Sequence, residues 1–301
     1  MSDGSRLLSD EARTALGGLR FRPRIAAEGR VSGVHASSHL GQSLEFSDLK
    51  GYAFGDDPRG IDWKVYARSD KLYVRRYLDE TNLTAHIVVD ASGSMAAPIP
   101  DSKFRHAASV AAGMAYVLLR QGDEVGLAVA SERRPATCAA RSVPSHLNEI
   151  LGLLGRARPA GATVLERTLR EVLSRARRKG VVVLASDLLA PVAPLVDVLG
   201  ILAARGHAVM LLHVLSQEER TFPFQGTVVF RSEESGESAL LDARALRRRY
   251  LQAVEGFVGQ VRSACHDARV FYCPVPMQRP PHVEAAEVIR SVEAGRHRRT
   301  V

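Results

Sequence analysis

The sequence predicts an α/β fold: a doubly wound, mostly parallel sheet with helices on both faces and an irregular N-terminal extension that contains short strands. Two observations support this class. From residue 84 onward, short apolar runs alternate with segments of helical periodicity, which is typical of a parallel sheet covered by helices. Before residue 80 the chain is polar, arginine-rich and irregular. We therefore expect an extension at 1–80 that packs on a main domain at 81–301.

The elements of the main domain are expected in alternating order. Apolar runs predict strands at 84–89, 124–130, 181–186, 208–215 and 269–273, with a short extended piece at 227–230. A segment at 135–141 is expected to pair antiparallel with the strand at 124–130. Helical periodicity predicts helices at 102–120, 145–156, 165–178, 194–204, 242–263 and 282–293. In the extension, Ser9 is a candidate N-cap for a helix at 9–20, and residues 72–77 alternate like a strand.

The composition is that of a globular protein. Its 301 residues are 46% hydrophobic and 25% charged, which is enough apolar material for a sizeable core. The N-terminus lacks the apolar segment of a signal peptide, and no apolar run is long and uncharged enough to span a bilayer. We therefore expect a cytoplasmic protein, with peripheral membrane association left open. The three cysteines lack metal-ligand spacing, so we expect small buried hydrophobes and no disulfide framework.

The net charge of +8 permits acidic or anionic partners. The basic residues are scattered along the chain, however, and no basic motif is interleaved with aromatic residues as in single-stranded nucleic-acid binders. Nucleic acid is therefore not the expected partner, although a basic nucleic-acid-binding protein stays an alternative.

One carboxylate and two hydroxyl side chains alternate directly after the strand predicted at 84–89, as Asp90-x-Ser92-x-Ser94. On a curled loop these positions point to one side, and Gly93 lets the backbone curl. One anionic oxygen with neutral hydroxyls suits a small, hard cation such as Mg²⁺, and Mn²⁺ suits the same ligands. The pattern alone is weak, because a capped strand-to-helix turn uses the same residue types.

Two further oxygen ligands stand where the predicted topology needs them. Thr163 precedes the helix at 165–178, and Asp187 follows the strand at 181–186. Each alone would serve as a helix cap. Doubly wound sheets bind ligands at the carboxyl ends of their strands, where the strand order reverses. Because Asp90, Thr163 and Asp187 are expected at that rim together, we favour a metal site over separate caps.

This region resembles von Willebrand factor type A domains. Asp90-x-Ser92-x-Ser94, Thr163 and Asp187 match, in order, the metal-ion-dependent adhesion site of that family. The resemblance covers about residues 84–204 well and the C-terminal third less specifically. It implies a Rossmann-like sheet and an ion that completes its shell with a carboxylate from a protein partner. The implied role is adhesion, with no catalytic residue.

The segment before the sheet carries a second resemblance. Its distinctive residues are Gly55, Asp56, Asp57, Pro58, Arg59, Asp62, Trp63 and Lys64. The stretch is similar to the motif of the family called domain of unknown function 58, in which it precedes a type A-like domain. That resemblance implies a MoxR-type AAA+ ATPase as partner and a role as adaptor in protein remodelling or maturation.

The motif residues have two interpretations. They form either a charged surface for that partner or a structural network. We favour the network slightly, because a turn at 55–58, with Asp57 as its cap and Arg59 paired with Asp62, explains these residue types without a ligand. Trp63, the only tryptophan, is then expected to pack against the sheet.

An enzyme is the main alternative, as a metal-dependent phosphohydrolase or phosphoacceptor with Asp90 as nucleophile. Such chemistry usually needs a second carboxylate beside the nucleophile and a lysine. Positions 92 and 94 are serines, and no lysine follows the strand at 181–186. The sequence around Ser92 also lacks the Gly-x-Ser-x-Gly elbow of serine hydrolases. A binding protein is therefore expected, and a type A-like scaffold whose metal is absent or purely structural stays open.

Overall fold

The computed structural model describes residues 6–23, 45–54, 58–78, 83–132, 135–231 and 238–294. It divides into two compact units, one formed by Met1–Glu28 together with Leu83–Val301 and the other by Gly29–Asn82. The smaller unit ends at Asn82, close to the domain boundary expected near residue 80. The first residues of the predicted extension, in contrast, belong to the larger unit.

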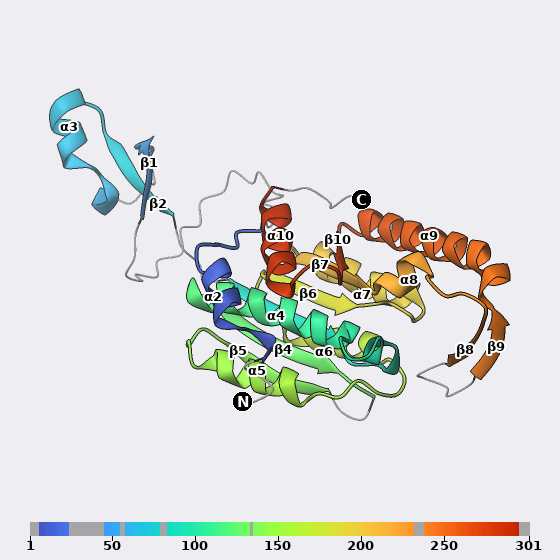
Figure 1. The fold of residues 1–301 in the computed structure, drawn as a ribbon. Helices are drawn as coiled ribbons and strands as arrows, with labels where there is room; N and C mark the ends of the chain where they lie inside the picture. Colours follow the sequence, from blue (N-terminus) through green and yellow to red (C-terminus); the bar gives the residue numbers. More distant parts are fainter. Residues whose placement is uncertain are drawn as a thin grey trace. The chain divides into compact units, whose positions relative to one another are not determined.

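The larger unit alternates strands and helices as expected (Figure 1). In chain order it comprises α2 (Asp10–Leu16), β3 (Thr84–Asp90), η2 (Gly93–Ala96), α4 (Lys103–Arg120), β4 (Glu124–Ala130), β5 (Ala136–Arg141), α5 (His146–Arg156), α6 (Leu165–Arg175), β6 (Val181–Ser186), α7 (Val192–Ala204), β7 (Ala208–Leu215), α8 (Gln217–Thr221), β8 (Thr227–Arg231), β9 (Ser238–Asp242), α9 (Ala243–Asp267), β10 (Phe271–Pro276) and α10 (Pro281–Glu293).

Six of these strands form one sheet in the order β10-β7-β6-β3-β4-β5. All neighbours pair in parallel except β4 and β5, which pair antiparallel, as the sequence predicted. Read from β5, the order is that of a doubly wound sheet whose direction of growth reverses between β3 and β6. The carboxyl ends of β3 and β6 are therefore neighbours at the switch point.

Helices cover both faces of the sheet because its central strands are apolar on both sides. β6 is buried at every position, which is typical of a parallel strand between two helix layers. One core lies between the sheet and the helices α2, α4, α5 and α10. The other core lies under α6, α7 and α9. Figure 1 shows α4 crossing the middle of one face.

The N-terminal helix belongs to the first of these cores. Ser9 caps α2 by accepting a hydrogen bond from the backbone N–H of Ala12, as the sequence predicted. Gly113 of α4 admits close packing there, since a Cβ atom at this position would lie 3.0 Å from Leu16 and 3.1 Å from Ala285. Helix α2 thus packs on α4 and α10.

The smaller unit is a two-stranded antiparallel ribbon with one short helix. It comprises β1 (Glu45–Gly51), η1 (Pro58–Gly60), α3 (Trp63–Ser69) and β2 (Tyr73–Leu78). Strand β2 was predicted; β1 and α3 were not. The exposed fraction of Trp63 is 63%, and its ring makes an edge-to-face contact with Tyr66 of the same unit.

Three other sequence predictions need correction. β10 begins two residues later than predicted and continues through Pro274 and Pro276. These prolines are tolerated because β10 is an edge strand. The piece predicted at 227–230 is one half of a hairpin, β8 with β9, and the short helix α8 was not predicted. No helix in the described part of the chain is long and apolar enough to cross a membrane.

A buried histidine on α4 makes stability depend on pH. Burial lowers the pKa of His106 to about 4, and its buried Nε2 atom has no hydrogen-bond partner among the described residues. The unfolded chain takes up this proton near its ordinary pKa of 6.5, so stability is full above that pH and falls as the pH drops toward 4. Between about pH 8 and about pH 4, we expect the free energy of unfolding to fall by about 3 kcal/mol less in His106→Gln than in wild type. Urea unfolding at both pH values measures this difference, and equal losses in the two proteins would contradict it.

Candidate metal-binding rim

The carboxyl ends of β3 and β6 bring two of the predicted ligands to the switch point. Asp90 is the last residue of β3, and Asp187 directly follows β6. Both side chains are buried, with about 1% of each residue exposed. The two strands are neighbours in register, since Val89 of β3 lies opposite Ala185 of β6. The predicted rim therefore exists, and two carboxylates lie on it.

Asp90 is held by two hydrogen bonds from neutral donors. Its Oδ1 atom accepts a bond from the backbone N–H of Ser92 at 2.9 Å, and its Oδ2 atom accepts one from the hydroxyl of Ser186 at 2.6 Å. Burial raises the pKa of Asp90 to about 6; these bonds lower it, and the neighbouring Asp187 raises it. The described residues provide no cation that pairs with this carboxylate. Sequence reasoning missed Ser186, whose only signal was a hydroxyl next to the predicted ligand Asp187.

The hydroxyl groups of Ser92 and Ser94 lie 3.2 Å apart, on the same side of the turn that follows β3. The turn is fastened to the loop before α6 by two backbone hydrogen bonds. Gly93 N–H donates to Gly161 O at 2.8 Å, and Ala160 N–H donates to Ala91 O at 3.1 Å. This loop carries Thr163. The third predicted segment is therefore docked against the first.

Thr163 is half-buried, and its Oγ1 atom accepts a long hydrogen bond of 3.5 Å from the backbone N–H of Leu165. This bond places the hydroxyl at the start of α6. This contact is not the cap that the sequence offered as the alternative to a ligand role, because the N-cap of α6 is Val164 and no side-chain hydrogen bond caps it. It is long enough that the hydroxyl group keeps acceptor capacity for a cation.

Asp187 is aimed by an unusual backbone turn. The next residue, Leu188, has a φ of 55° although it is a buried leucine. This left-handed conformation costs about 1 kcal/mol in a residue with a Cβ atom. It is held by Leu188 N–H, which donates to the Ser186 hydroxyl at 2.9 Å, and by Leu189 N–H, which donates to Asp187 Oδ1 at 3.1 Å.

A buried lysine joins this rim, and the sequence gave no indication of it. Lys103, the first residue of α4, is about 1% exposed, and its ammonium nitrogen lies 2.8 Å from Asp187 Oδ2. It also pairs with Glu219 of α8. Burial lowers the pKa of Lys103, but the two carboxylates outweigh that effect and raise it. Glu219 in turn completes a capping box with Ser216 at the start of α8, so the lysine ties α4, β6 and α8 together.

A neutral histidine fixes the backbone at the same place. Burial lowers the pKa of His213 on β7 to about 4. Its Nε2 atom lies 3.1 Å from the carbonyl oxygen of Asp187, and its Nδ1 atom lies 2.8 Å from the hydroxyl of Tyr272. Because a carbonyl can only accept, Nε2 carries the proton and Nδ1 accepts from the tyrosine. His213 thus positions the Asp187 backbone and is not available as a metal ligand.

The charges and donor types at this rim fit a small divalent cation. Asp90, Asp187 and Glu219 bring three carboxylates, whereas Lys103 is the one cationic side chain described among them. A buried carboxylate without a counter-charge is costly. Two adjacent hydroxyls supply the neutral oxygens that Mg²⁺ accepts. The excess negative charge lies on Asp90, the residue that the sequence placed first in the ligand set.

The loop that carries Thr163 depends on a glycine. Gly161 has a φ of 74°, and a Cβ atom there would collide with the carboxylate of Glu132. We expect Gly161→Ala to lower the free energy of unfolding by about 1–2 kcal/mol, since alanine adds strain in the left-handed region. Gly256→Ala, in open space on α9, is the matched control and should raise stability by about 0.5–1 kcal/mol. Urea unfolding of both variants measures the effect. A Gly161→Ala protein as stable as wild type would refute a strained, left-handed backbone at residue 161.

The motif of the smaller unit lies apart from these ligands in sequence, and the structure describes it only in part. Gly55, Asp56 and Asp57 lie outside the described residues. Pro58 and Arg59 form the short helix η1. Asp62 is the N-cap of α3, since its Oδ1 atom accepts hydrogen bonds from the backbone N–H groups of Lys64 and Val65. For Asp62 the structural interpretation is therefore sufficient.

A second cluster has metal-ligand residue types. Cys138 of β5 and His146 and Glu149 of α5 bring their ligand atoms within 4.8 Å of one another, which sequence spacing did not reveal. Both ring nitrogens of His146 are engaged, Nε2 with the carbonyl of Val125 at 2.9 Å and Nδ1 with Glu149 at 3.0 Å. These polar contacts explain the cluster without an ion. The three cysteines are free, as expected.

Comparison with known families is consistent with the motif. The model of the family described as "Protein of unknown function DUF58" matches residues 48–256, which is more than half of the chain. This chain belongs to that family. The match spans both the Pro58–Lys64 segment and the proposed ligands.

Relatives and solved structures show similarity at low identity. The uncharacterized proteins Rv1480 of Mycobacterium tuberculosis (strain ATCC 25618 / H37Rv) and Mb1516 of Mycobacterium bovis are each 28% identical over 226 residues, covering 74% of this chain and 71% of theirs. An aerotolerance-related membrane protein from Bacteroides fragilis matches with a TM-score of 0.49 and 14% identity, over 71% of this chain and all of that one. The SpRpn10 VWA domain matches with a TM-score of 0.41 and 12% identity, over 68% and 95%. These structural scores are low, and no conclusion about function follows from them.

Proposed function

We propose that this DUF58 protein is a non-enzymatic, metal-dependent protein-binding module. The observation that carries the proposal is Asp90: a buried carboxylate with a pKa raised to about 6, two hydrogen bonds from neutral donors, and no cationic partner among the described residues. A Mg²⁺ ion, or Mn²⁺ in its place, would supply the missing positive charge. The oxygens that would hold it belong to Asp90, Ser92, Ser94, Thr163 and Asp187.

The bound ion would attract a carboxylate from a protein partner. The residues of this chain prepare that contact. Ser186 orients Asp90 through a hydrogen bond. Lys103 neutralises part of the charge of Asp187, which reduces the repulsion between the carboxylates of Asp90 and Asp187. A binding role needs no activated water and no general base. It therefore agrees with the state of His213, whose two ring nitrogens both form hydrogen bonds at this rim.

The proposed partner is a MoxR-type AAA+ ATPase, with this protein acting as an adaptor in remodelling or maturing other proteins. Support comes from family membership and from the motif at 55–64, through the resemblance described above. The test is a pull-down of that ATPase from native lysate by wild type and Asp90→Asn, with Mg²⁺ and with EDTA. We expect capture only by wild type and only with Mg²⁺. Equal capture under all four conditions would refute a metal-dependent contact.

One observation keeps a second function open. The sequence argued against an aspartyl phosphoacceptor for want of a nearby lysine, and the structure places Lys103 beside Asp187 at the same rim. Its ammonium group is paired with Asp187 and Glu219, however, and not with Asp90 in the described part of the chain. The binding role is therefore preferred. Incubation with acetyl phosphate decides between them, because acid-labile phosphate on wild type that is absent from Asp90→Asn would establish the phosphoacceptor.

A further inference from the structure

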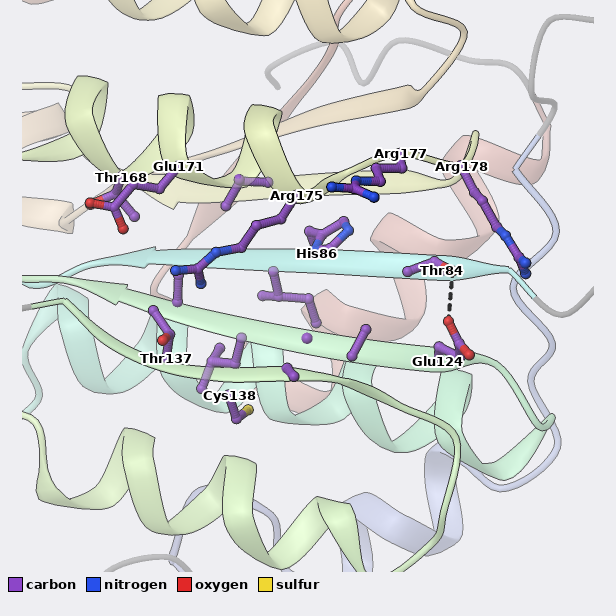
Figure 2. Close-up of a pocket in the computed structure, with 17 residues that line it drawn as sticks. Thr84, His86, Glu124, Thr137, Cys138, Thr168, Glu171, Arg175, Arg177 and Arg178 are labelled. Carbon is purple, nitrogen blue, oxygen red and sulfur yellow. Dashed lines mark hydrogen bonds between the residues drawn. The ribbon is translucent and has the colours of Figure 1, made fainter.

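A groove that the proposed metal site does not use lies over strands β3, β4 and β5 (Figure 2). It has a volume of about 540 Å³ and is bounded by the sheet on one side and by α6 with the turn that follows it on the other. It begins at the amino ends of β3 and β4, near Thr84 and Glu124. None of the five proposed metal ligands lines it.

Three arginines form the basic rim of this groove: Arg175, Arg177 and Arg178. All three are exposed, and none of them forms an ion pair with another described residue. Figure 2 shows them spread along the direction of the strands. Arg175 and Arg177 point in one direction along the strands, and Arg178 points in the other direction, past Thr84. The guanidinium groups therefore do not converge on one point, as they would around a single phosphate.

The carboxylates of the groove are already engaged. Glu124 accepts a hydrogen bond from the hydroxyl of Thr84 at 2.9 Å, and Glu171 pairs with Arg167 at 3.3 Å. His86 adds no charge near neutral pH, because burial and the nearby His207 lower its pKa. Glu124 keeps its negative charge, because its hydroxyl donor is neutral, but three arginines outnumber it, and this excess of positive charge favours an anionic occupant.

Four of the residues that line the floor of the groove, on the sheet side, are small. Gly126 and Ala128 of β4 and Ala139 and Ala140 of β5 line it. A bulge between Val125 and Leu127 interrupts the pairing of β4 with β5 at Gly126, where a Cβ atom would lie 3.2 Å from the backbone of Ala140. Short side chains leave room for an extended backbone above the sheet.

From these features we propose that the groove binds an extended, acidic peptide segment of a protein partner. The row of arginines matches carboxylates repeated along such a segment, and the small-residue floor admits its backbone. A nucleic acid fits less well, because no tyrosine, phenylalanine or tryptophan lines the groove to stack on bases. The interaction goes beyond the proposed metal site and does not need a metal ion.

The test is fluorescence anisotropy in EDTA with a labelled peptide of alternating glutamate and threonine, which favours an extended conformation. The triple variant R175Q/R177Q/R178Q is expected to bind about tenfold more weakly than wild type, since it loses three charge contacts. The matched control is R244Q/R248Q/R249Q, which removes three exposed arginines from α9. It should change the affinity less than about twofold.

A second variant distinguishes binding in the groove from non-specific electrostatic attraction of the peptide. Ala139→Phe fills the floor without changing the net charge and is expected to weaken binding about as much as the triple variant. Equal losses in both arginine triples would show non-specific attraction and overturn the proposal. Failure of wild type to bind the peptide would overturn it too, as would tighter binding of a labelled oligouridine that the groove variants abolish. Because EDTA is present throughout, none of these outcomes depends on the metal site.

Discussion

Lys103→Met is expected to lower the free energy of unfolding by about 3 kcal/mol or more, because it leaves two carboxylates without their counter-charge. Methionine keeps most of the apolar stem but removes the ammonium group. Asp187 would then stay buried without its cationic partner, and Glu219 would lose its partner on α4. Urea unfolding near neutral pH measures the loss.

Two variants test the cause. Lys179→Met changes an exposed lysine of the same unit and should alter stability by less than about 0.5 kcal/mol. The double variant Lys103→Met/Asp187→Asn removes both charges and should recover much of the loss, since two members of one ion pair are not additive. If the double variant is as unstable as the sum of the single variants, then Lys103 acts by packing and not by charge.

Asp90→Asn is expected to stabilise the metal-free protein near neutral pH, by up to about 3 kcal/mol. The pKa of Asp90 is raised from 3.8 to about 6 by burial. The wild-type protein therefore has its full stability below pH 3.8, the pKa of Asp90 in the unfolded chain, and loses stability as the pH rises through about 6. Asparagine keeps the shape of the side chain and carries no charge, so its advantage should be small near pH 4, grow as the pH rises to about 6, and stay constant above that.

The comparison is made in EDTA, with unfolding followed in urea at several pH values. Asp197→Asn, which changes an exposed carboxylate on α7, is the control and should differ little from wild type at every pH. Differences between variant and wild type are compared, because the buried histidines His106 and His213 shift stability in the opposite direction over an overlapping range. An Asp90→Asn protein that is less stable than wild type above pH 6 would show that the carboxylate is already compensated.

The regular part of the fold was predictable because burial leaves a pattern of apolar residues in the sequence. The central strands β3, β6 and β7 are apolar runs, and the helices that cover them are amphipathic or apolar. Strand β9 lacked that signal, since all five of its residues are exposed. Helix α8 could have been found from Ser216 and Glu219, whose spacing is that of a capping box.

The sequence predicted those residues of the candidate site that directly follow a strand, but not the contacts between residues far apart in the sequence. Asp90 and Asp187 each follow an apolar run, so the topology alone brings them to one rim. Lys103 and Glu219 were missed because they are 116 residues apart, and no periodicity links two side chains across the sequence. The sequence also argued from the absence of a lysine after β6. The structure brings one from the start of α4, which corrects that argument.

Calorimetric titration of Mg²⁺ into the metal-free protein tests the central claim, that oxygens at the β3–β6 rim hold a divalent cation. Wild type is expected to show one saturable binding event. Ser94→Ala should weaken it by about tenfold or more, and Asp90→Asn should abolish it while remaining folded. An absence of binding to wild type, or the same affinity in all three proteins, would contradict the account.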